Sequence, residues 1–163
     1  MHGVSGSGKS TVAQEVSKKK QAVILRADAI RKHLTNTPMT KSDAAIYDKA
    51  TSDLVYSFLA ERAIILAESG LNVILDATFL EQSRREEVFS KLDESQIQNH
   101  ILSVVCSEET AMKRIKARIG DVSDANDKIL KMQLDKFSPI SESEKSRVIE
   151  IQNDSVPDLS LLK

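Results

Sequence analysis

A glycine-rich segment near the start of the chain is the feature that most constrains the fold. Residues 3–10 read Gly-Val-Ser-Gly-Ser-Gly-Lys-Ser and match the pattern G-x-x-x-x-G-K-[ST]. Glycines at these positions let the backbone turn tightly with its N–H groups pointing inward, which suits a phosphate group. A helical pattern follows over residues 10–20, so the positive end of a helix would face the same phosphate.

This pattern predicts a phosphate-binding loop for ATP or GTP. Lys9 would bridge the β- and γ-phosphates, and the Ser10 hydroxyl would bind Mg²⁺. A chance glycine-rich turn would match the four fixed positions in roughly one chain of this length in a few hundred. The residues expected to bind the nucleotide are Gly3, Val4, Ser5, Gly6, Ser7, Gly8, Lys9, Ser10 and Thr11.

Strand-like and helix-like segments alternate along the rest of the chain, as is typical of an α/β domain with a mainly parallel sheet. Apolar β-rich runs occupy residues 22–25, 71–75 and 100–106, with a weaker candidate at 147–151. No internal repeat, low-complexity tract or composition shift marks a second domain. The helical patterns cover residues 10–20, 29–34, 42–69, 81–92, 108–119 and 125–137. Gly70 would end the third of these helices, and Ser107 would be the N-cap of the fifth.

Only Met1 and His2 precede the glycine-rich loop, where such a loop normally follows a strand. We therefore expect residues 1–163 to form a single domain that is truncated, or incompletely represented, at its amino-terminal end. Losing a buried central strand would remove several apolar side chains, each worth about 1.5–3 kcal/mol, so such a chain would be poorly stable.

Composition limits the classes of function. The 23 Lys and Arg residues against 24 Asp and Glu argue against a large surface for nucleic acid, which rests on many basic contacts to phosphate. The single cysteine, Cys106, excludes an internal disulfide and gives no sign of secretion. No signal peptide or bilayer-spanning apolar run is found, and no His, Cys or carboxylate cluster has zinc-ligand spacing. We expect a cytoplasmic domain without a membrane partner.

An acidic and a basic residue follow the first apolar run. Asp28 would lie at the carboxyl end of a parallel strand, where it could accept the proton of an attacking hydroxyl group. Arg31, three residues later, could hold an anionic part of the substrate. Asp28 could equally well serve only to cap the short helix 29–34.

The second apolar run ends in Val-Ile-Leu-Asp at residues 73–76, a pattern in which Asp76 would hold Mg²⁺. The motif is weak alone and gains weight beside the glycine-rich loop. Ala77 follows, where many ATP-hydrolysing motors place a water-activating Glu, so the sequence favours transfer to an acceptor over hydrolysis.

Two pairs of arginines come later. Arg84 and Arg85 open a predicted helix, and because adjacent side chains diverge by about 100°, at most one of them would reach the site while the other would be solvated. Arg114 and Arg118 share one helix face and precede the polar turn 120–124, which could form a lid over the phosphates. A solvated basic stripe is the alternative for this second pair.

Taken together, these blocks resemble the "predicted kinase" AAA-type ATP-binding domains. The resemblance rests on residues 3–11, 28–31, 73–79 and 121–125 with the Arg114/Arg118 pair, and it covers nearly the whole chain. These domains are related to zeta-toxin kinases and to the kinase domain of polynucleotide 5′-kinases. They are often fused to aminoglycoside-phosphotransferase-like domains, so fusion or association with another domain is expected.

The resemblance implies a three-layer α/β/α P-loop fold, similar to nucleoside-monophosphate kinases, without its first strand. It also implies roles for individual residues. Asp28 would be the general base and Arg31 would bind the acceptor, while Asp76 and Thr78 would line the site. Arg84 or Arg85 would contact the substrate. Arg114 and Arg118 would be lid and nucleotide contacts, and the chain at residues 153–155 would run beside the nucleotide base.

The leading hypothesis is therefore a phosphotransferase that moves the γ-phosphate of ATP or GTP to a hydroxyl acceptor. A nucleic-acid end is an allowed acceptor, but the balanced charge favours a metabolite or mononucleotide. The alternative is a nucleotide-binding regulatory ATPase without a dedicated acceptor. A degenerate structural relative is disfavoured because Lys9 and Ser10 are intact.

Overall fold

Two pairs of parallel strands form the centre of the computed structural model, which describes residues 1–39, 44–117, 133, 135, 137–155, 157 and 159. Strand β1 (Ala22–Arg26) pairs with β2 (Asn72–Asp76), and β3 (Ile101–Val105) pairs with β4 (Val148–Gln152). The predicted parallel strands are confirmed, with ends that agree within one or two residues.

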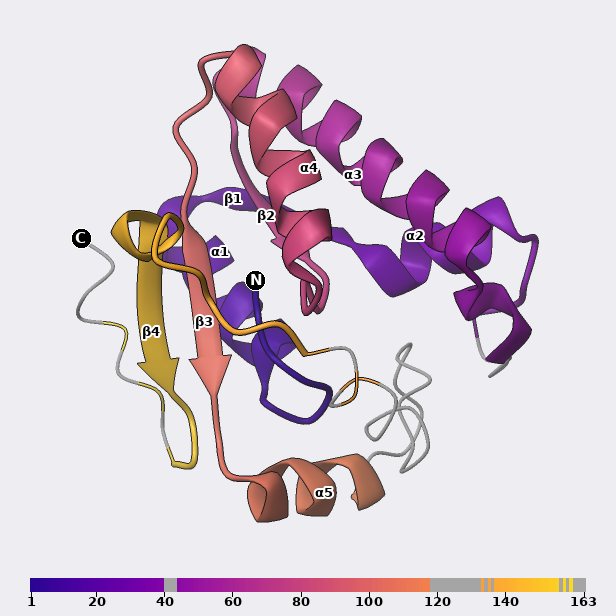
Figure 1. The fold of residues 1–163 in the computed structure, drawn as a ribbon, viewed down its shortest axis with the longest axis vertical. Coiled ribbons are helices and arrows are strands. Elements are labelled where there is room, and N and C mark those ends of the chain that lie inside the picture. The colour runs from indigo at the N-terminus through magenta and orange to yellow at the C-terminus, as the bar shows by residue number, and fades with distance from the viewer. Residues whose placement is uncertain are drawn as a thin grey trace.

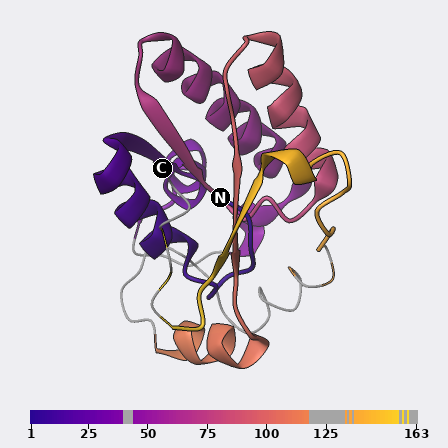
Figure 2. The ribbon, with the colours of Figure 1, turned by 90° about the vertical axis from the view of Figure 1, so that its left-hand side faces the viewer.

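Met1 and His2 lie between the two pairs, as both views of the ribbon show (Figure 1 and Figure 2). The amino group of Met1 donates a hydrogen bond of 2.8 Å to the carbonyl oxygen of Leu75 on β2. On the other side, the N–H of His2 bonds to the carbonyl of Leu102, and the N–H of Val104 bonds to the carbonyl of His2, both at 2.8 Å. These two residues thus occupy the position of a central parallel strand, at its carboxyl end.

The helices cover both faces of the strands, which confirms the predicted α/β layering. Helix α1 (Lys9–Lys20) packs on one face, and α3 (Lys49–Glu68) and α4 (Gln82–Glu94) pack on the other (Figure 2). Side chains alternate along a strand, so Ile74 joins the core under α1 while its neighbours Val73 and Leu75 join the core under α3 and α4.

Three shorter elements complete the described chain. Helix α2 (Ala27–Leu34) follows β1 directly, and α5 (Glu108–Lys116) follows β3 near the glycine-rich loop, as Figure 1 shows. Ser107 accepts a hydrogen bond from the N–H of Thr110, which confirms it as the N-cap of α5. A 3₁₀ turn at Lys145–Arg147 leads into β4.

The predicted helix over residues 42–69 is partly wrong. A 3₁₀ turn, Ala44–Tyr47, precedes α3, and the two are separated by Asp48, whose carboxylate accepts from the N–H of Thr51 at 2.9 Å and caps the helix. The apolar spacing continues through the turn, but an N-cap aspartate starts the helix anew. The predicted stop at Gly70 is confirmed, since this glycine follows α3 with φ of +83°. Most of the predicted helix 125–137 lies outside the described residues.

A buried ion pair fastens α4 to the segment before β4. The side chain of Arg85 is 0% exposed, and its Nε and Nη2 donate to Glu144 at 2.6 and 3.0 Å. The remaining donors reach the carbonyl oxygens of residues 79–80 and 138–139 at 3.0 to 3.2 Å. Burial by itself raises the pKa of Glu144, but hydrogen bonds from Arg85 and Ser141 outweigh it and lower that pKa to about 2.

None of the helices in the described part of the chain combines the length and the apolar character needed to cross a bilayer.

Replacing Glu144 by glutamine should destabilise the protein strongly, because the guanidinium of Arg85 would stay buried without its counter-charge. We expect the free energy of unfolding to fall by about 3 kcal/mol, measured by urea denaturation at neutral pH. The matched control is Glu142→Gln, which breaks only an exposed pair with Lys145 and should change the unfolding free energy by less than about 0.5 kcal/mol. Equal losses in the two variants would contradict the role given to the pair.

Candidate active site

The glycine-rich loop connects the central position of the sheet to α1. Gly6 and Gly8 have φ of +84° and +91°, values that side-chain-bearing residues rarely adopt. A Cβ on Gly6 would lie 2.4 Å from the carbonyl oxygen of Ala111, and one on Gly8 would lie 2.1 Å from Nδ2 of Asn153. The backbone therefore needs glycine at both positions for conformation and for space, as the motif predicts.

Helix α1 begins at Lys9 with Gly8 as its N-cap and no side-chain capping bond. The first N–H groups of a helix have no partner within the helix, so this end faces the loop with donors and a positive dipole. Lys9 is 9% exposed, and its Nζ donates to the carbonyl oxygen of Val4 across the loop at 2.8 Å. Ser10 is half-buried in the same turn, while Thr11 is exposed.

Two later segments contact the loop. Asn153, directly after β4, donates from Nδ2 to the carbonyl oxygen of Ser7 at 2.6 Å, and Nη1 of Arg114 on α5 reaches the same oxygen at 3.3 Å. The N–H of Ser5 donates to Oε1 of Gln133 at 2.7 Å. Arg114 is thus brought to the predicted nucleotide site.

Arg118, the other half of the predicted lid pair, lies outside the described residues, as does the turn 120–124.

Asp76 lies at the carboxyl end of β2, as predicted, and it is 7% exposed. Its carboxylate pairs with Nε of Arg26 at 3.5 Å, across the two paired strands. Two residues later, the carbonyl oxygen of Thr78 accepts from the N–H of Gly3 at 3.1 Å, which ties the segment after β2 to the start of the loop. Burial raises the pKa of the Tyr56 hydroxyl group on α3, and the nearby Thr78 side chain acts in the opposite direction.

Asp28 lies in the first turn of α2. The N-cap of this helix is Arg26, so the interpretation that Asp28 only caps a helix beginning at residue 29 is wrong. Burial raises the pKa of Asp28 above its ordinary value, and the charges of Arg31 and Lys9 act in the opposite direction. The hydroxyl group of Tyr47 donates to its Oδ1 at 3.3 Å.

Arg31 lies one helical turn after Asp28 and is 5% exposed. Its guanidinium stacks over the ring of Tyr47 at 4.6 Å from the centroid. Within the residues that the structure describes, Nε and Nη1 of Arg31 are buried and have no hydrogen-bond partner. A buried donor without a partner carries a large desolvation cost, so this guanidinium is suited to bind an anionic ligand by donating hydrogen bonds to it.

Arg84 and Arg85 have different surroundings, and neither is the solvated surface arginine that the sequence predicts for one of them. Arg84 forms ion pairs with Asp53 and with Glu87 and lies over the ring of Tyr56 at 5.5 Å. The guanidinium of Arg85 donates hydrogen bonds to Glu144 and to four carbonyl groups, because its position on α4 faces the interior of the protein. Arg85 therefore has its donors engaged away from any substrate.

Sequence reasoning missed several contributors. Tyr47 and Gln133 reach the site through tertiary contacts, and no local signal marks them. Asp53, the partner of Arg84, looks like any exposed helical acid in the sequence. Asn153 was predicted only through the resemblance, although the sequence itself carries a signal for it: a polar residue directly after a buried parallel strand lies at the edge where ligands bind.

The residues present fit a phosphate ligand with Mg²⁺. The loop supplies N–H donors, a lysine and a helix end, and Ser10 and Asp76 supply hard oxygen atoms of the kind that Mg²⁺ prefers. Among the described residues no group of three or more His, Cys, Asp or Glu side chains could hold a metal alone. Mg²⁺ keeps waters and phosphate oxygens among its ligands and needs few from the protein.

Comparisons with known proteins support this fold. An uncharacterised protein of Mycobacterium tuberculosis, Rv2004c, is 29% identical over 134 residues, which cover 78% of this chain. The chain spans about a quarter of the length of the curated relatives it matches, 26% of that protein.

Two solved structures have a similar fold. A sugar kinase from Janibacter superposes with a TM-score of 0.74 at 21% identity, covering 94% of this chain and 83% of the other. A gluconokinase from Sinorhizobium meliloti gives a TM-score of 0.68 at 19% identity, covering 94% and 81%.

A family model described as an AAA domain, AAA_33, matches residues 1–140, which include the glycine-rich loop and every described candidate residue except residues 153–155. The match extends over most of the chain and includes the glycine-rich loop. The chain therefore belongs to this family of AAA domains, with a P-loop fold shared by kinases.

Proposed function

We propose that this domain transfers the γ-phosphate of ATP or GTP to a hydroxyl group of an acceptor, with Asp28 as the general base. The observation that carries the proposal is the position of Asp28. Burial raises the pKa of its carboxyl group, and the positive charges of Arg31 beside it and of Lys9 in the loop act on it in the opposite direction. A base that interacts electrostatically with both groups can serve a hydroxyl that attacks the terminal phosphate.

The nucleotide would be held by the loop from Gly3 to Gly8 and by the first turn of α1, including Thr11. Backbone N–H groups and Lys9 would neutralise phosphate charge, and Arg114 would add a second positive charge from α5. Arg118 stays a prediction for the same task. Mg²⁺, held by Ser10 and Asp76, would neutralise charge on the phosphates and orient them.

The acceptor would lie against α2 and the start of α4. Asp28 would take the proton from its hydroxyl group, and the unpartnered donors of Arg31 favour an anionic group elsewhere on the acceptor. Thr78 would line this space. Of the two neighbouring arginines, only Arg84 is proposed as a substrate contact, because the donors of Arg85 are engaged in the interior.

The acceptor class that fits best is a metabolite or mononucleotide with an anionic group. The formal net charge of −1 supports this choice over a polynucleotide end, which would call for a basic channel. A regulatory ATPase without an acceptor is the competing function, and it differs in one respect that can be measured. Such a protein would turn over nucleotide independently of any acceptor and of Asp28.

Replacing Lys9 by methionine should weaken nucleotide binding, because the loop loses the charged donor that would reach the phosphates. We expect the dissociation constant for Mg·ATP or Mg·GTP, measured by calorimetry, to rise by about tenfold or more. The control is Lys18→Met on the same helix, where the lysine pairs only with exposed Glu15. Unchanged affinity in the Lys9 variant would contradict the proposal that this loop binds the nucleotide that donates the phosphate.

Replacing Asp28 by asparagine should slow transfer strongly and leave nucleotide binding intact. Radiolabelled γ-phosphate transfer to a panel of anionic and neutral hydroxyl acceptors should fall by about 10²-fold or more, the usual contribution of a general base. The control is Asp93→Asn, which breaks an exposed pair with Arg147 at the far end of α4. Nucleotide turnover that ignores acceptors and survives in the Asp28 variant would favour the regulatory ATPase.

The rate of transfer should depend on pH through Asp28. The carboxylate must be ionised to take a proton, and burial raises its pKa, so the rate should fall on the acid side at a pH above the ordinary carboxyl value of 3.8. Because the charge of Arg31 lowers the pKa of Asp28, the Arg31→Gln variant should lose rate at a higher pH than the wild type. An acid limb that does not move in that variant would contradict the coupling.

A further inference from the structure

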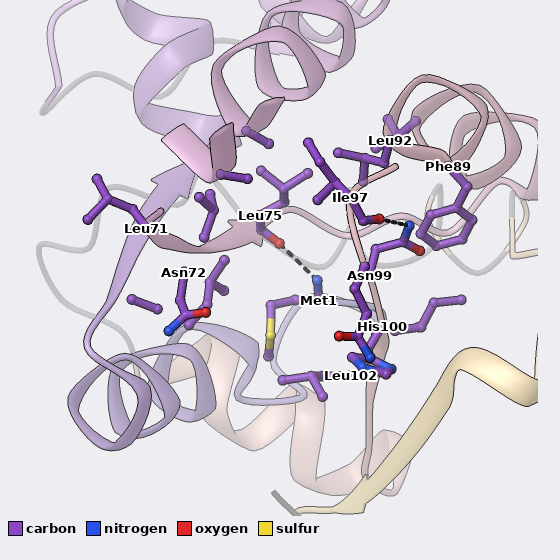
Figure 3. A pocket seen from close by; sticks show the side chains of 18 of the residues that line it. Met1, Leu71, Asn72, Leu75, Phe89, Leu92, Ile97, Asn99, His100 and Leu102 are labelled. Atoms are coloured by element: carbon purple, nitrogen blue, oxygen red, sulfur yellow. Dashed lines mark hydrogen bonds between the residues drawn. The ribbon is translucent and has the colours of Figure 1, made fainter. Parts of the chain in front are cut away.

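A cavity of about 920 Å³ lies between β2 and β3, and Figure 3 shows Leu75 and Leu102 on its two sides. Its described lining includes the amino-terminal ends of β1, β2 and β3, at Ala22, Asn72 and Ile101, and no residue of α2. Ligands of parallel α/β sheets bind at the opposite, carboxyl edge. The surroundings of the candidate acceptor groups on α2 are therefore given by their own contacts and not by this cavity.

The side chain of Tyr47, which lies outside α2, contacts both candidate acceptor groups on that helix. Its hydroxyl group donates to Oδ1 of Asp28 at 3.3 Å, and Cζ of Arg31 lies over its ring, 4.6 Å from the centroid. Asp28 and Arg31 are three residues apart on α2, so they are neighbours on one face of the helix. Tyr47 thus touches the proposed base with its polar end and the proposed anion-binding group with its apolar face.

The position of Tyr47 is set by α3 and the turn before it. Tyr47 is the last residue of the 3₁₀ turn Ala44–Tyr47, and Asp48, the N-cap of α3, follows it directly. The Asp48 carboxylate accepts from the N–H of Thr51 at 2.9 Å, and Ile46 on the other side of Tyr47 is buried. A helix cap and a buried apolar side chain therefore hold the backbone of Tyr47 independently of the two α2 residues that it contacts.

The ring contact leaves the hydrogen-bond donors of Arg31 available. The N–H groups of arginine lie in the plane of the guanidinium group, so a ring that covers one face of this group does not engage them. Within the described residues, Nε and Nη1 of Arg31 are buried and have no hydrogen-bond partner. A ring that already fixes the guanidinium plane reduces the conformational freedom that would be lost when an anion binds.

The hydroxyl group of Tyr47 acts on Asp28 in a different way. Burial raises the pKa of the Asp28 carboxyl group, and the charged groups that act on it, Arg31, Lys9 and Arg26, lower that pKa. The hydrogen bond from Tyr47 also lowers it, because this bond favours the ionised carboxylate. At 3.3 Å the bond is longer than most O–H···O bonds, as catalytic hydrogen bonds often are before a substrate binds.

We propose that Tyr47 is a positioning residue for the transfer reaction: its ring holds the Arg31 guanidinium for the anionic group of the acceptor, and its hydroxyl group orients the Asp28 carboxylate toward the acceptor hydroxyl. The inference rests on the proposed function for the roles of Asp28 and Arg31. In the reaction the acceptor oxygen bonds to the γ-phosphorus, the bond from that phosphorus to the departing nucleoside diphosphate breaks, and the acceptor proton passes to Asp28. Tyr47 takes no part in the proton transfer.

The first test follows the titration of Asp28 in the full chain by NMR of its carboxyl carbon, without any acceptor. The Tyr47→Phe variant keeps the ring and loses the hydroxyl group, so the pKa of Asp28 should be higher than in the wild type. The matched control is Tyr56→Phe, which removes a hydroxyl group near Thr78 and should leave the titration of Asp28 unchanged. A role of Tyr47 in packing alone would not move this titration in the Tyr47→Phe variant.

The second test uses sulfate as the anion and follows the Nε–H resonance of Arg31 by NMR, so that sulfate bound at the glycine-rich loop is not counted. We expect the dissociation constant to stay within about twofold in Tyr47→Phe and to rise by about fivefold or more in Tyr47→Leu, which removes the ring. The control is Phe58→Leu, which removes the ring beside Arg62 on α3 and should leave sulfate binding at Arg31 unchanged.

The two functions of the side chain should separate in transfer assays with an anionic acceptor. Tyr47→Phe should keep the KM for that acceptor and lose rate at a higher pH than the wild type, because Asp28 must be ionised. Tyr47→Leu should also raise the KM by about fivefold or more.

An unchanged titration of Asp28 in Tyr47→Phe, or wild-type sulfate affinity in a folded Tyr47→Leu variant, would overturn the inference and leave the proposed function standing. If Tyr47→Leu does not fold, the titration in Tyr47→Phe decides alone. Both expected changes without transfer to any acceptor would support the contacts of Tyr47 and contradict the proposed function instead.

Discussion

The backbone hydrogen bonds of the first three residues hold the structure together. Met1 bonds to β2, His2 bonds on both sides of Ser103 in β3, and Gly3 bonds to the carbonyl of Thr78. Through them two separate strand pairs form one layer, and the glycine-rich loop starts at a fixed place between them. Together with the packing of α1 on β1 and β2, these bonds set the position of the helix end of α1 relative to the carboxylate at the end of β2.

Charge is distributed around this frame in two ways. The pair formed by Arg85 and Glu144 is buried with all its hydrogen bonds made, so its effect is structural: it fastens α4 to the segment before β4. The groups near the loop are different. Arg31 has buried donors without partners among the described residues, and Asp28 has a carboxyl pKa raised by burial. Buried donors without partners and a carboxyl group with a raised pKa are characteristic of a site that binds a ligand.

Much of this could be predicted from the sequence where the signal is local. The glycine-rich loop, the four strands and the N-cap at Ser107 depend on neighbouring residues, and the structure confirms them. Two predictions failed for different reasons. The break before α3 comes from a local signal, the Asp48 N-cap, which the continuous apolar spacing masks. The burial of Arg85 depends on Glu144, a residue 59 positions away, which no helical pattern reveals.

Local sequence is enough to specify the backbone of the glycine-rich loop, because residues with a side chain rarely adopt the conformations of Gly6 and Gly8, and to specify the order of alternating strands and helices. The tertiary structure alone decided which charges meet. It placed Asp28 inside the first turn of α2 rather than at its cap, stacked Arg31 on Tyr47, and turned Arg85 inward. It also formed a cavity between β2 and β3. The physical reason is that backbone conformation is set by each residue and its neighbours, whereas burial and ion pairing are set by segments that meet only after folding.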